Sequence, residues 1–257
     1  MFDLKSIQTS TADRPPRIIL CGVPKIGKST FAAGADAPIF LPIRGEEGID
    51  DLAVPHFPSI STFDELMEAL GTLASDNHEF KTVAIDSIST LQPIIWDAVC
   101  RKEGGVANIE KVDGGFGKGY IRALDFWREV RDALDYLRAE KGMTVILIGH
   151  VIVKTFSDPT GESYDQYQLD LQAKASEMLT RWADAILFAN SKALVRTEKE
   201  GQTKSTKKAT VREERCLFTQ KRPAHPGGGR GVYGRLPYEL PLTWEAFMEA
   251  ITNTAAQ

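Results

Sequence analysis

The stretch that most constrains the fold is residues 17–31, where a short apolar run, a glycine-rich turn and a helix start follow one another. Residues 18–21 have the length and apolar character of a buried strand. From Gly22 to Ser29 the chain reads G-x-x-x-x-G-K-S, in which the glycines let the backbone approach an anion closely. The pattern therefore predicts a strand, a phosphate-binding loop and a helix that begins at Lys28.

The residues of this loop are the first candidate ligands for a nucleotide. Successive backbone N–H groups in such a turn form an anion-binding concavity. In this pattern the ammonium group of Lys28 reaches the β- and γ-phosphates, and the hydroxyl of Ser29 is a ligand for Mg²⁺. The predicted nucleotide-binding residues of the loop are Gly22, Val23, Pro24, Lys25, Ile26, Gly27, Lys28, Ser29 and Thr30.

Strand and helix patterns alternate along the rest of the chain. Apolar runs predict strands at residues 38–43, 81–86, 143–148 and 183–189, and periodic apolar positions predict helices at 63–73, 90–101, 120–141, 170–182 and 243–251. This alternation implies an α/β fold, a mostly parallel sheet flanked by helices, in one domain at 17–257 after a polar lead-in at 1–16. Residues 151–168 are expected to be a polar connection, and residues 192–219 two strands of a C-terminal hairpin.

Composition excludes several classes of protein. No apolar run approaches the roughly 20 residues that a membrane span needs, and the first residues lack the apolar core of a secretory signal. The three cysteines are far apart and the four histidines are dispersed, so the sequence indicates neither disulfides nor a zinc site. A soluble protein of a reducing cytoplasm is expected.

Positive charge is concentrated near the C-terminus, although the whole chain carries a net charge of −4. Residues 191–235 contain twelve Lys and Arg against four Asp and Glu. This asymmetry indicates a polyanionic partner. A solvated hairpin tip would explain the same composition equally well.

Polar residues at strand ends supply the candidate catalytic groups. Asp86 closes an apolar strand, where a carboxylate can hold Mg²⁺ beside the phosphate loop. Glu46 and Glu47 follow the strand after the phosphate-loop helix and are candidates to orient the attacking water, with an acidic surface turn as the alternative. His150 ends the strand after Asp86. It is a candidate sensor that contacts the γ-phosphate and transmits the loss of this phosphate to residues 151–168. The alternative is a structural histidine.

Two later segments contain residue types that bind single-stranded nucleic acid. The glycine-rich stretch at 115–120 contains Phe116, Lys118 and Tyr120, and the connection after His150 contains Tyr164 and Tyr167. Aromatic rings stack on bases, and a cation follows the phosphate backbone. Without a known position these are also ordinary loop residues, but both segments are expected to leave the same edge of the sheet.

Taken in order, these motifs resemble a phage-type family of RecA-like nucleotide-binding proteins, minimal RecA/Rad51-like cores associated with single-strand annealing and recombination. The resemblance covers roughly residues 15–250. It rests on the phosphate loop at 22–29, Glu46-Glu47-Gly48, Ile85-Asp86-Ser87, the loop at 115–120, His150, Arg181-Trp182-Ala183-Asp184 and Leu236-Pro237.

The resemblance implies a RecA-like P-loop ATPase that uses ATP and Mg²⁺ and assembles into rings or filaments with ATP at subunit interfaces. Single-stranded DNA is the implied partner, with annealing assisted by a single-strand-binding protein, in the cytoplasm of the host cell if the chain is phage-encoded. By position, Glu46 matches the catalytic glutamate of this family, Asp86 the Walker B carboxylate and His150 the sensor.

The family's late basic motif, which reaches the phosphates bound by a neighbouring subunit, falls near Arg230. Here the sequence departs from the family pattern, because Arg230-Gly231-Val232 lacks a second basic residue. Arg222 and Arg235 are therefore rival candidates for the residue that acts on a neighbour's ATP.

Two other functions use the same phosphate loop. A nucleoside or nucleotide kinase would need an arginine-rich lid, for which only residues 221–235 are available. An ATP-switched scaffold for replication proteins would need nucleotide binding without hydrolysis. The leading prediction is an Mg²⁺/ATP-dependent single-stranded-DNA-binding protein, followed by these two in the order given.

Overall fold

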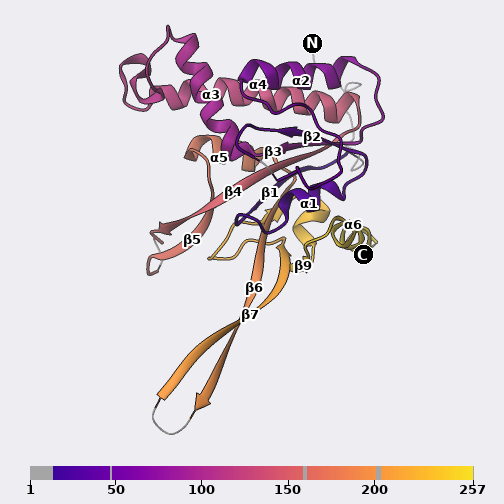
Figure 1. Cartoon of the computed structure of the whole chain (residues 1–257), viewed down its shortest axis with the longest axis vertical. Helices are drawn as coiled ribbons and strands as arrows, with labels where there is room; N and C mark the ends of the chain where they lie inside the picture. The colour runs from indigo at the N-terminus through magenta and orange to yellow at the C-terminus, as the bar shows by residue number, and fades with distance from the viewer. Residues whose placement is uncertain (1–13, 47, 159–160, 201–203, 257) are drawn as a thin grey trace, which may run out of the picture.

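The computed structural model describes residues 14–46, 48–158, 161–200 and 204–256, and for residues 193–200 and 204–213 it describes the backbone alone. Most of the predicted lead-in at 1–16, and Glu47 of the predicted catalytic pair, lie outside the described residues. A central sheet has the strand order β2-β3-β4-β1-β6-β7-β9 (Figure 1). Its strands are β2 (Pro38–Pro42), β3 (Thr82–Asp86), β4 (Thr144–Phe156), β1 (Arg17–Gly22), β6 (Ala185–Glu200), β7 (Lys204–Phe218) and β9 (Glu239–Pro241).

The half of the sheet that carries the phosphate loop is parallel. β1 lies between β4 and β6, and β2 pairs with β3, which pairs with β4, all in parallel register. Residues 18–21 of β1 are fully buried, as expected for a strand covered on both faces. The carboxyl ends of β1, β2, β3 and β4 therefore meet at one edge, as the sequence predicts.

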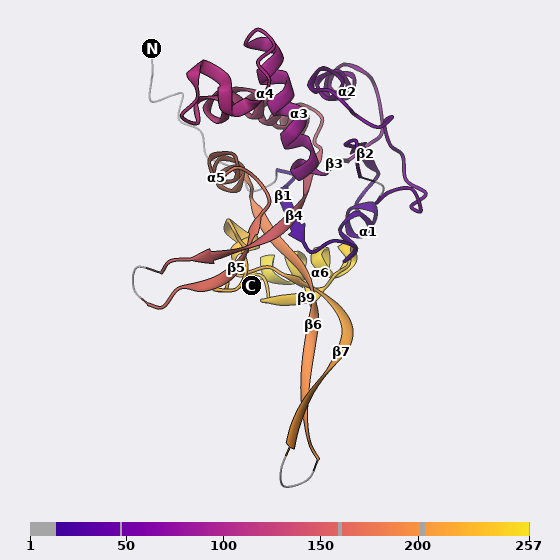
Figure 2. The same ribbon diagram turned by 60° about the vertical axis from the view of Figure 1, so that its left-hand side comes forward.

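Helices cover both faces of the sheet (Figures 1 and 2). The helices on one face pack on the core that contains Trp127 and Leu134. The helices on the other face pack on a second core, in which Phe31 contacts Trp244 and Phe247 edge to face. The first set is α2 (Phe63–Ser75), α3 (Ile88–Lys102), α4 (Lys118–Glu140) and α5 (Ala173–Trp182), and the second is α1 (Lys28–Ala33) and α6 (Trp244–Ala255). This arrangement confirms the predicted α/β class.

The prediction for residues 151–168 is wrong, because they form a β-hairpin rather than a polar connection. β4 continues past His150 to Phe156 and pairs antiparallel with β5 (Tyr164–Leu169). Beyond His150 the strand has no parallel neighbour and pairs with β5 alone among the described strands. The hairpin projects from the body at the carboxyl edge of the sheet (Figure 2).

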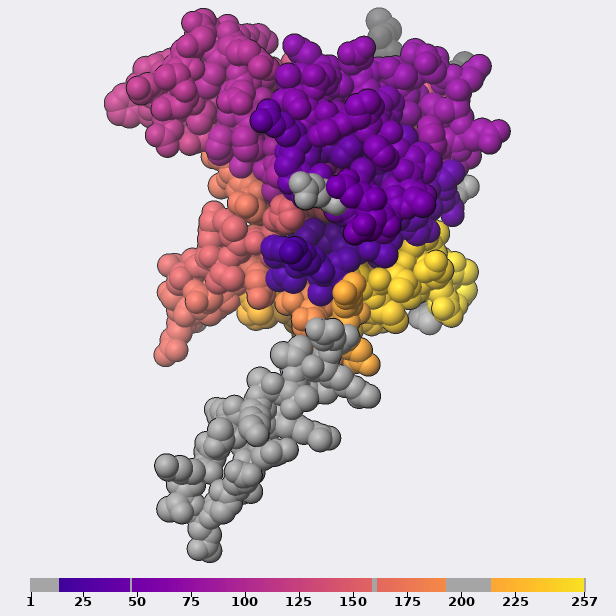
Figure 3. All heavy atoms as spheres, in the orientation of Figure 1, coloured from indigo at the N-terminus to yellow at the C-terminus, as the bar shows by residue number. Residues whose placement is uncertain are grey.

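A second projection joins α3 to α4. It contains the 3₁₀ segment η2 (Ile109–Gly114), where the sequence predicts only loop, and ends in a turn with positive φ angles at residues 113–117. The carbonyl oxygen of Ile109 lies 2.0 Å from where a Cβ on Gly119 would stand, so the start of α4 packs directly on this segment. In Figure 3 this projection and the β4–β5 hairpin lie on the same side of the molecule with a recess between them.

The predicted C-terminal hairpin is present as β6 and β7, which pair antiparallel from Phe188 and Phe218 to Glu200 and Lys204. Its outer part extends far from the body as a two-stranded arm (Figures 1 and 2). We use "arm" for residues 193–213. After β7 the chain returns to the body through β8 (Gly228–Gly229), the 3₁₀ segment η3 (Gly231–Arg235) and β9.

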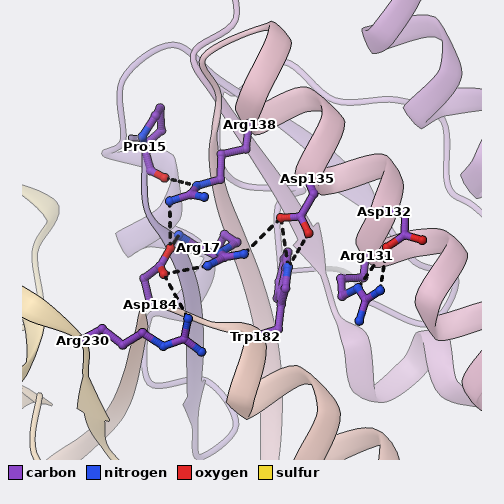
Figure 4. Close-up of polar contacts among 9 residues, drawn as sticks. All are labelled: Pro15, Arg17, Arg131, Asp132, Asp135, Arg138, Trp182, Asp184 and Arg230. Atoms are coloured by element: carbon purple, nitrogen blue, oxygen red, sulfur yellow. Dashed lines mark hydrogen bonds and ion pairs between the residues drawn. The ribbon is translucent and has the colours of Figure 1, made fainter. Parts of the chain in front are cut away.

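A polar network ties the amino edge of the sheet together (Figure 4). The guanidinium of Arg17, at the start of β1, donates to Asp184 just before β6 and to Asp135 of α4. The indole of Trp182 donates to Asp135, and Arg138 donates to Asp184 at 3.3 Å. Burial raises the pKa of Asp184, but the bonds from Arg17 outweigh it and the net shift is downward. The network therefore joins two sheet strands to two helices.

None of the described helices is long and apolar enough to cross a membrane.

Candidate nucleotide site

The phosphate loop is a tight turn between β1 and α1, as the sequence predicts. Gly27 has a φ of 110° and Lys25 a φ of 60°, so the turn uses the left-handed region twice. Gly22 has no room for a side chain, because a Cβ there would lie 2.3 Å from the carbonyl oxygen of Ala189 in β6. The side chain of Ile26 is buried in the core, so this residue offers its backbone to a ligand. The turn has the shape of a phosphate cradle.

Lys28 is folded into this turn. Its ammonium group donates to the carbonyl oxygens of Gly22 at 3.1 Å and Val23 at 3.0 Å, and the residue is only 6% exposed. Burial lowers the pKa of Lys28, and the nearby carboxylates of Asp86 and Glu46 oppose that shift without cancelling it. The loop thus holds one cation at its centre, where terminal phosphates bind in this motif.

Ser29 and Asp86 form a pair of hard oxygen donors beside the loop. The Ser29 hydroxyl donates to the Asp86 carboxylate at 2.6 Å. Burial raises the pKa of Asp86, and the bond from Ser29 only partly offsets this. The backbone of Gly48 packs against Ser29 on the other side, since a Cβ on Gly48 would lie 2.7 Å from the Ser29 Oγ.

This donor set fits Mg²⁺. Among the described residues no three His, Cys, Asp or Glu side chains cluster so as to hold a metal. Mg²⁺ commonly takes one or two protein oxygens and fills its octahedron with phosphate and water oxygens. Ser29 and Asp86 would supply the protein share of such a site.

Glu46 and His150 meet next to this pair. One oxygen of Glu46 accepts from the Ser87 hydroxyl at 2.7 Å and contacts the His150 Nε2 at 2.8 Å. Burial raises the pKa of Glu46, but the hydrogen bonds from His150 and Ser87 together outweigh it, so the net shift is downward. Glu46 is therefore an ionised carboxylate at neutral pH. The Nδ1 of His150 is buried and has no hydrogen-bond partner among the described residues. The backbone N–H of His150 donates to the Ser89 hydroxyl.

These groups face one cavity of about 560 Å³, within the size range of small-ligand pockets. Its walls come from the phosphate loop, the turn after β2 and the ends of β3 and β4, together with Asp51 and Arg215. Lys28, Glu46 and His150 of the predicted catalytic set are thus brought together with Asp86.

Sequence reasoning missed three polar residues of this site: Ser87, Asp51 and Arg215. Ser87 carries a local signal, since it directly follows the strand-closing Asp86 and caps α3 through Thr90. Asp51 has no such signal. Arg215 also has none, because it reaches the cavity only when β7 folds back beside β6.

Some of the side chains predicted to bind nucleic acid are exposed, and others are packed against neighbouring residues. Phe116 is 99% exposed at the tip of the α3–α4 projection. Lys118 donates to the carbonyl oxygen of Asp113 at 3.0 Å, and Tyr120 stacks edge to face on Trp96. Tyr120 is therefore committed to packing within the projection.

On the β4–β5 hairpin, Tyr164 forms a ring pair with Phe156, with centroids 5.4 Å apart. Phe156 is 37% exposed and was not singled out in the sequence. Tyr167 instead packs on Phe188 at 5.2 Å, inside the aromatic cluster below the hairpin. Thus Phe116 and the Phe156–Tyr164 pair present rings on the two projections, whereas Tyr167 is packed like Tyr120.

Arg230 lies far from the phosphate loop of its own chain. It approaches Asp184 to 4.0 Å at the amino edge of the sheet, whereas the loop follows the carboxyl end of β1 (Figure 4). Of its rivals, Arg222 stacks over Tyr238 at 4.4 Å and Arg235 is exposed at the end of η3. A contact between Arg230 and ATP would have to join two subunits, so this assignment stays a prediction.

The fold and this cavity together define a P-loop nucleotide-binding protein. The family model described as "AAA domain" matches residues 14–231, and the chain belongs to that family. Among solved structures, the chain is similar to one titled "Crystal structure of the RadB recombinase", with 12% identity, a TM-score of 0.41, and coverage of 83% of this chain and 84% of that one. No curated protein matches the chain significantly.

Proposed function

We propose that this protein is an Mg²⁺/ATP-dependent single-stranded-DNA-binding ATPase that promotes annealing in recombination, as a homo-oligomer and with a single-strand-binding protein as accessory partner. The observation that carries the proposal is the convergence of Lys28, Ser29, Asp86, Glu46 and His150 on one cavity. A phosphate cradle, two metal oxygens and an ionised carboxylate are the groups that ATP hydrolysis requires.

The chemistry follows from these side chains. Ser29 and Asp86 would hold Mg²⁺, which would supply positive charge to the phosphates of the nucleotide. Lys28 adds a second positive charge to the terminal phosphates, and the Glu46 carboxylate accepts a hydrogen bond from the attacking water and orients it. His150 and Ser87 hold that carboxylate in place through bonds of 2.8 and 2.7 Å. Both bonds engage the same oxygen of Glu46, Oε1.

The route from ATP to DNA runs along β4. His150 pairs with Gly22 of the phosphate loop in the β1–β4 register, and six residues further on the same strand reaches Phe156. Phe156 and Tyr164, together with Phe116 on the neighbouring projection, offer rings on which bases stack, a contact worth about 1–3 kcal/mol per base. Lys118 adds a cation to the same side, and Tyr120 and Tyr167 support the two projections from within.

Positive charge supports a polyanionic partner independently of these rings. The arm contains Arg196, Lys199, Lys204, Lys207, Lys208 and Arg212 in its sequence. Phosphate contacts from such a segment make binding steeply dependent on salt. In an oligomer, Arg230 of one subunit is proposed to reach the nucleotide of the next.

The test is ATP hydrolysis with and without single-stranded DNA. Wild-type protein is expected to hydrolyse ATP faster when DNA is added and to bind DNA more tightly with ATP than without it. Lys28→Ala should lose nucleotide binding and hydrolysis. Glu46→Gln should keep ATP and DNA binding but lose at least 100-fold in hydrolysis rate, as expected when a general base is removed.

Other outcomes would favour the alternatives. Transfer of the γ-phosphate to a nucleoside would identify a kinase. DNA annealing by Glu46→Gln at the wild-type rate would identify an ATP-switched scaffold that does not need hydrolysis. Failure to bind DNA in the presence of ATP would contradict the proposal itself.

A further inference from the structure

We propose that Arg215 is a phosphate ligand which the base of the arm supplies to the nucleotide bound by the same subunit. The inference rests on the proposed function, because it assumes that the cavity takes a nucleoside triphosphate. It adds a residue that lies outside the phosphate loop and outside the strand ends on which the site is otherwise built.

Arg215 reaches the cavity from the opposite side to the catalytic carboxylate. Its Nη1 lies 3.3 Å from where a Cβ on Gly27 would stand, so the guanidinium lies against the backbone of the phosphate loop. In the sheet, β1 separates β3 and β4, which carry Asp86 and His150, from β6 and β7. The loop is therefore flanked by Glu46 and His150 on one side and by Arg215 on the other.

The guanidinium of Arg215 is available for a ligand. It makes no hydrogen bond or ion pair with any residue in the described part of the chain, although it lines a cavity that also contains carboxylates. Two of those carboxylates have other partners, since Asp86 accepts from Ser29 and Glu46 contacts His150, and the third is Asp51. An arginine presents several N–H donors in a planar fork that matches two phosphate oxygens at once. The polar group that fits this position is a phosphate.

The backbone around Arg215 is held firmly, which makes its position a property of the fold. Arg215 pairs with Ser191 of β6, and its carbonyl oxygen accepts from the Leu242 N–H at 3.3 Å. The Leu242 side chain would lie 3.8 Å from a Cβ on Gly27, so the β7–β9 edge packs on the phosphate loop as well. Cys216, the next residue, is buried.

The same strand connects Arg215 directly to the arm, whose last residue, 213, lies two residues before it in the sequence. A nucleotide held by both the phosphate loop and Arg215 would connect β1 to the base of β7. Nucleotide binding would then fix the base of the arm relative to the loop. This link from the nucleotide to the arm is separate from the one that runs through His150 and β4 to the β4–β5 hairpin.

The experiment measures dissociation constants for a fluorescent ATP analogue in the full chain. Arg215→Ala is expected to weaken binding at least tenfold, because hydrogen bonds to charged groups are lost. Arg215→Lys keeps the positive charge but not the planar fork of N–H donors, so its dissociation constant should lie between those of wild type and Arg215→Ala. Arg101→Ala removes an exposed arginine of α3 outside this cavity, serves as the matched control and should bind as wild type. Thermal melting of each variant verifies that it is folded.

The results separate this inference from the proposed function. If wild type binds the analogue and Lys28→Ala does not, while Arg215→Ala binds as wild type, the inference is overturned and the proposed function stands. If wild-type protein binds no nucleotide, both fall. Mixing Lys28→Ala with Arg215→Ala subunits tests whether Arg215 acts within its own subunit. No recovery of binding is expected, and recovery would show that it acts on a neighbour instead.

Discussion

Gly48 allows a sharp test of the proposed metal site. Its backbone does not lie in the left-handed region, so alanine can adopt it without strain, but a Cβ would lie 2.7 Å from the Ser29 Oγ and 3.6 Å from the Asp86 carboxylate. Ordinary contacts begin near 3.4 Å, so the Ser29 hydroxyl would have to move by roughly 0.7 Å. A movement away from Asp86 would stretch the 2.6 Å bond to about 3.3 Å and displace one of the two protein oxygens proposed for Mg²⁺.

The magnitude is set by the one contact with the metal that is displaced, taken as equal to a hydrogen bond to a charged group. A hydrogen bond to a charged group contributes about 1.5–3 kcal/mol, and 1.4 kcal/mol corresponds to a tenfold change in affinity. Gly48→Ala should therefore weaken ATP binding in the presence of Mg²⁺ by about 10- to 100-fold. Binding with EDTA present should change much less, because the metal does not contribute there.

Titration of ATP by isothermal calorimetry, with Mg²⁺ and with EDTA, measures this difference. Gly71→Ala is the matched control, since a Cβ at this position in α2 meets no atom within 4 Å. It should bind ATP as wild type does. If Gly48→Ala keeps the full wild-type enhancement by Mg²⁺, then Ser29 and Asp86 are not the metal ligands.

Two further predictions concern stability. Asp184→Asn should cost about 3 kcal/mol at pH 7, the scale for removing one member of a buried ion pair. The pKa of Asp184 in the folded protein lies below the ordinary value of 3.8. The stabilisation by Asp184 is therefore complete at pH values above 3.8 and is lost as the pH falls through the pKa of the folded state. The difference in melting temperature from wild type should accordingly shrink below about pH 4, and a constant difference would contradict the assignment to Arg17 and Asp184. Thr62→Ala, which removes the N-cap of α2, should lower the free energy of unfolding, measured in urea, by about 1 kcal/mol. Thr62→Ser keeps the hydroxyl and is the control, whose free energy of unfolding should be unchanged. An equal loss of stability in both variants would show that Thr62 acts through packing and not through the cap.

Features that depend on neighbouring residues in the sequence could be predicted. The phosphate loop needs only the spacing from Gly22 to Ser29, and the capping box of α2 needs only Thr62 and Glu65, which bond to each other. The alternation of strands and helices indicated the parallel sheet, and that sheet brought Asp86 and His150 to one edge.

Features that depend on distant pairing could not be predicted. The sequence Val-Ile-Val-Lys-Thr-Phe after His150 has strand-forming residues, but its partner in β5 is separated by a turn, and the pairing decides the structure. Arg215 is the clearest case. It is 188 residues from Gly27 in the chain, and only the antiparallel return of β7 beside β6 places it against the phosphate loop.

The continuity of β4 has a mechanical consequence. Up to His150, β4 is paired on both sides, with β3 and with β1. Beyond His150 it pairs with β5 alone among the described strands. The outer part of β4 is therefore a projecting beam, a cantilever, whose fixed end lies at the nucleotide cavity. Six residues of strand span about 20 Å. A tilt of about 10° at His150 would move Phe156 sideways by about 3 Å, close to the rise between stacked bases. A tilt of that size at the fixed end would thus move the free end by about the spacing of one stacked base.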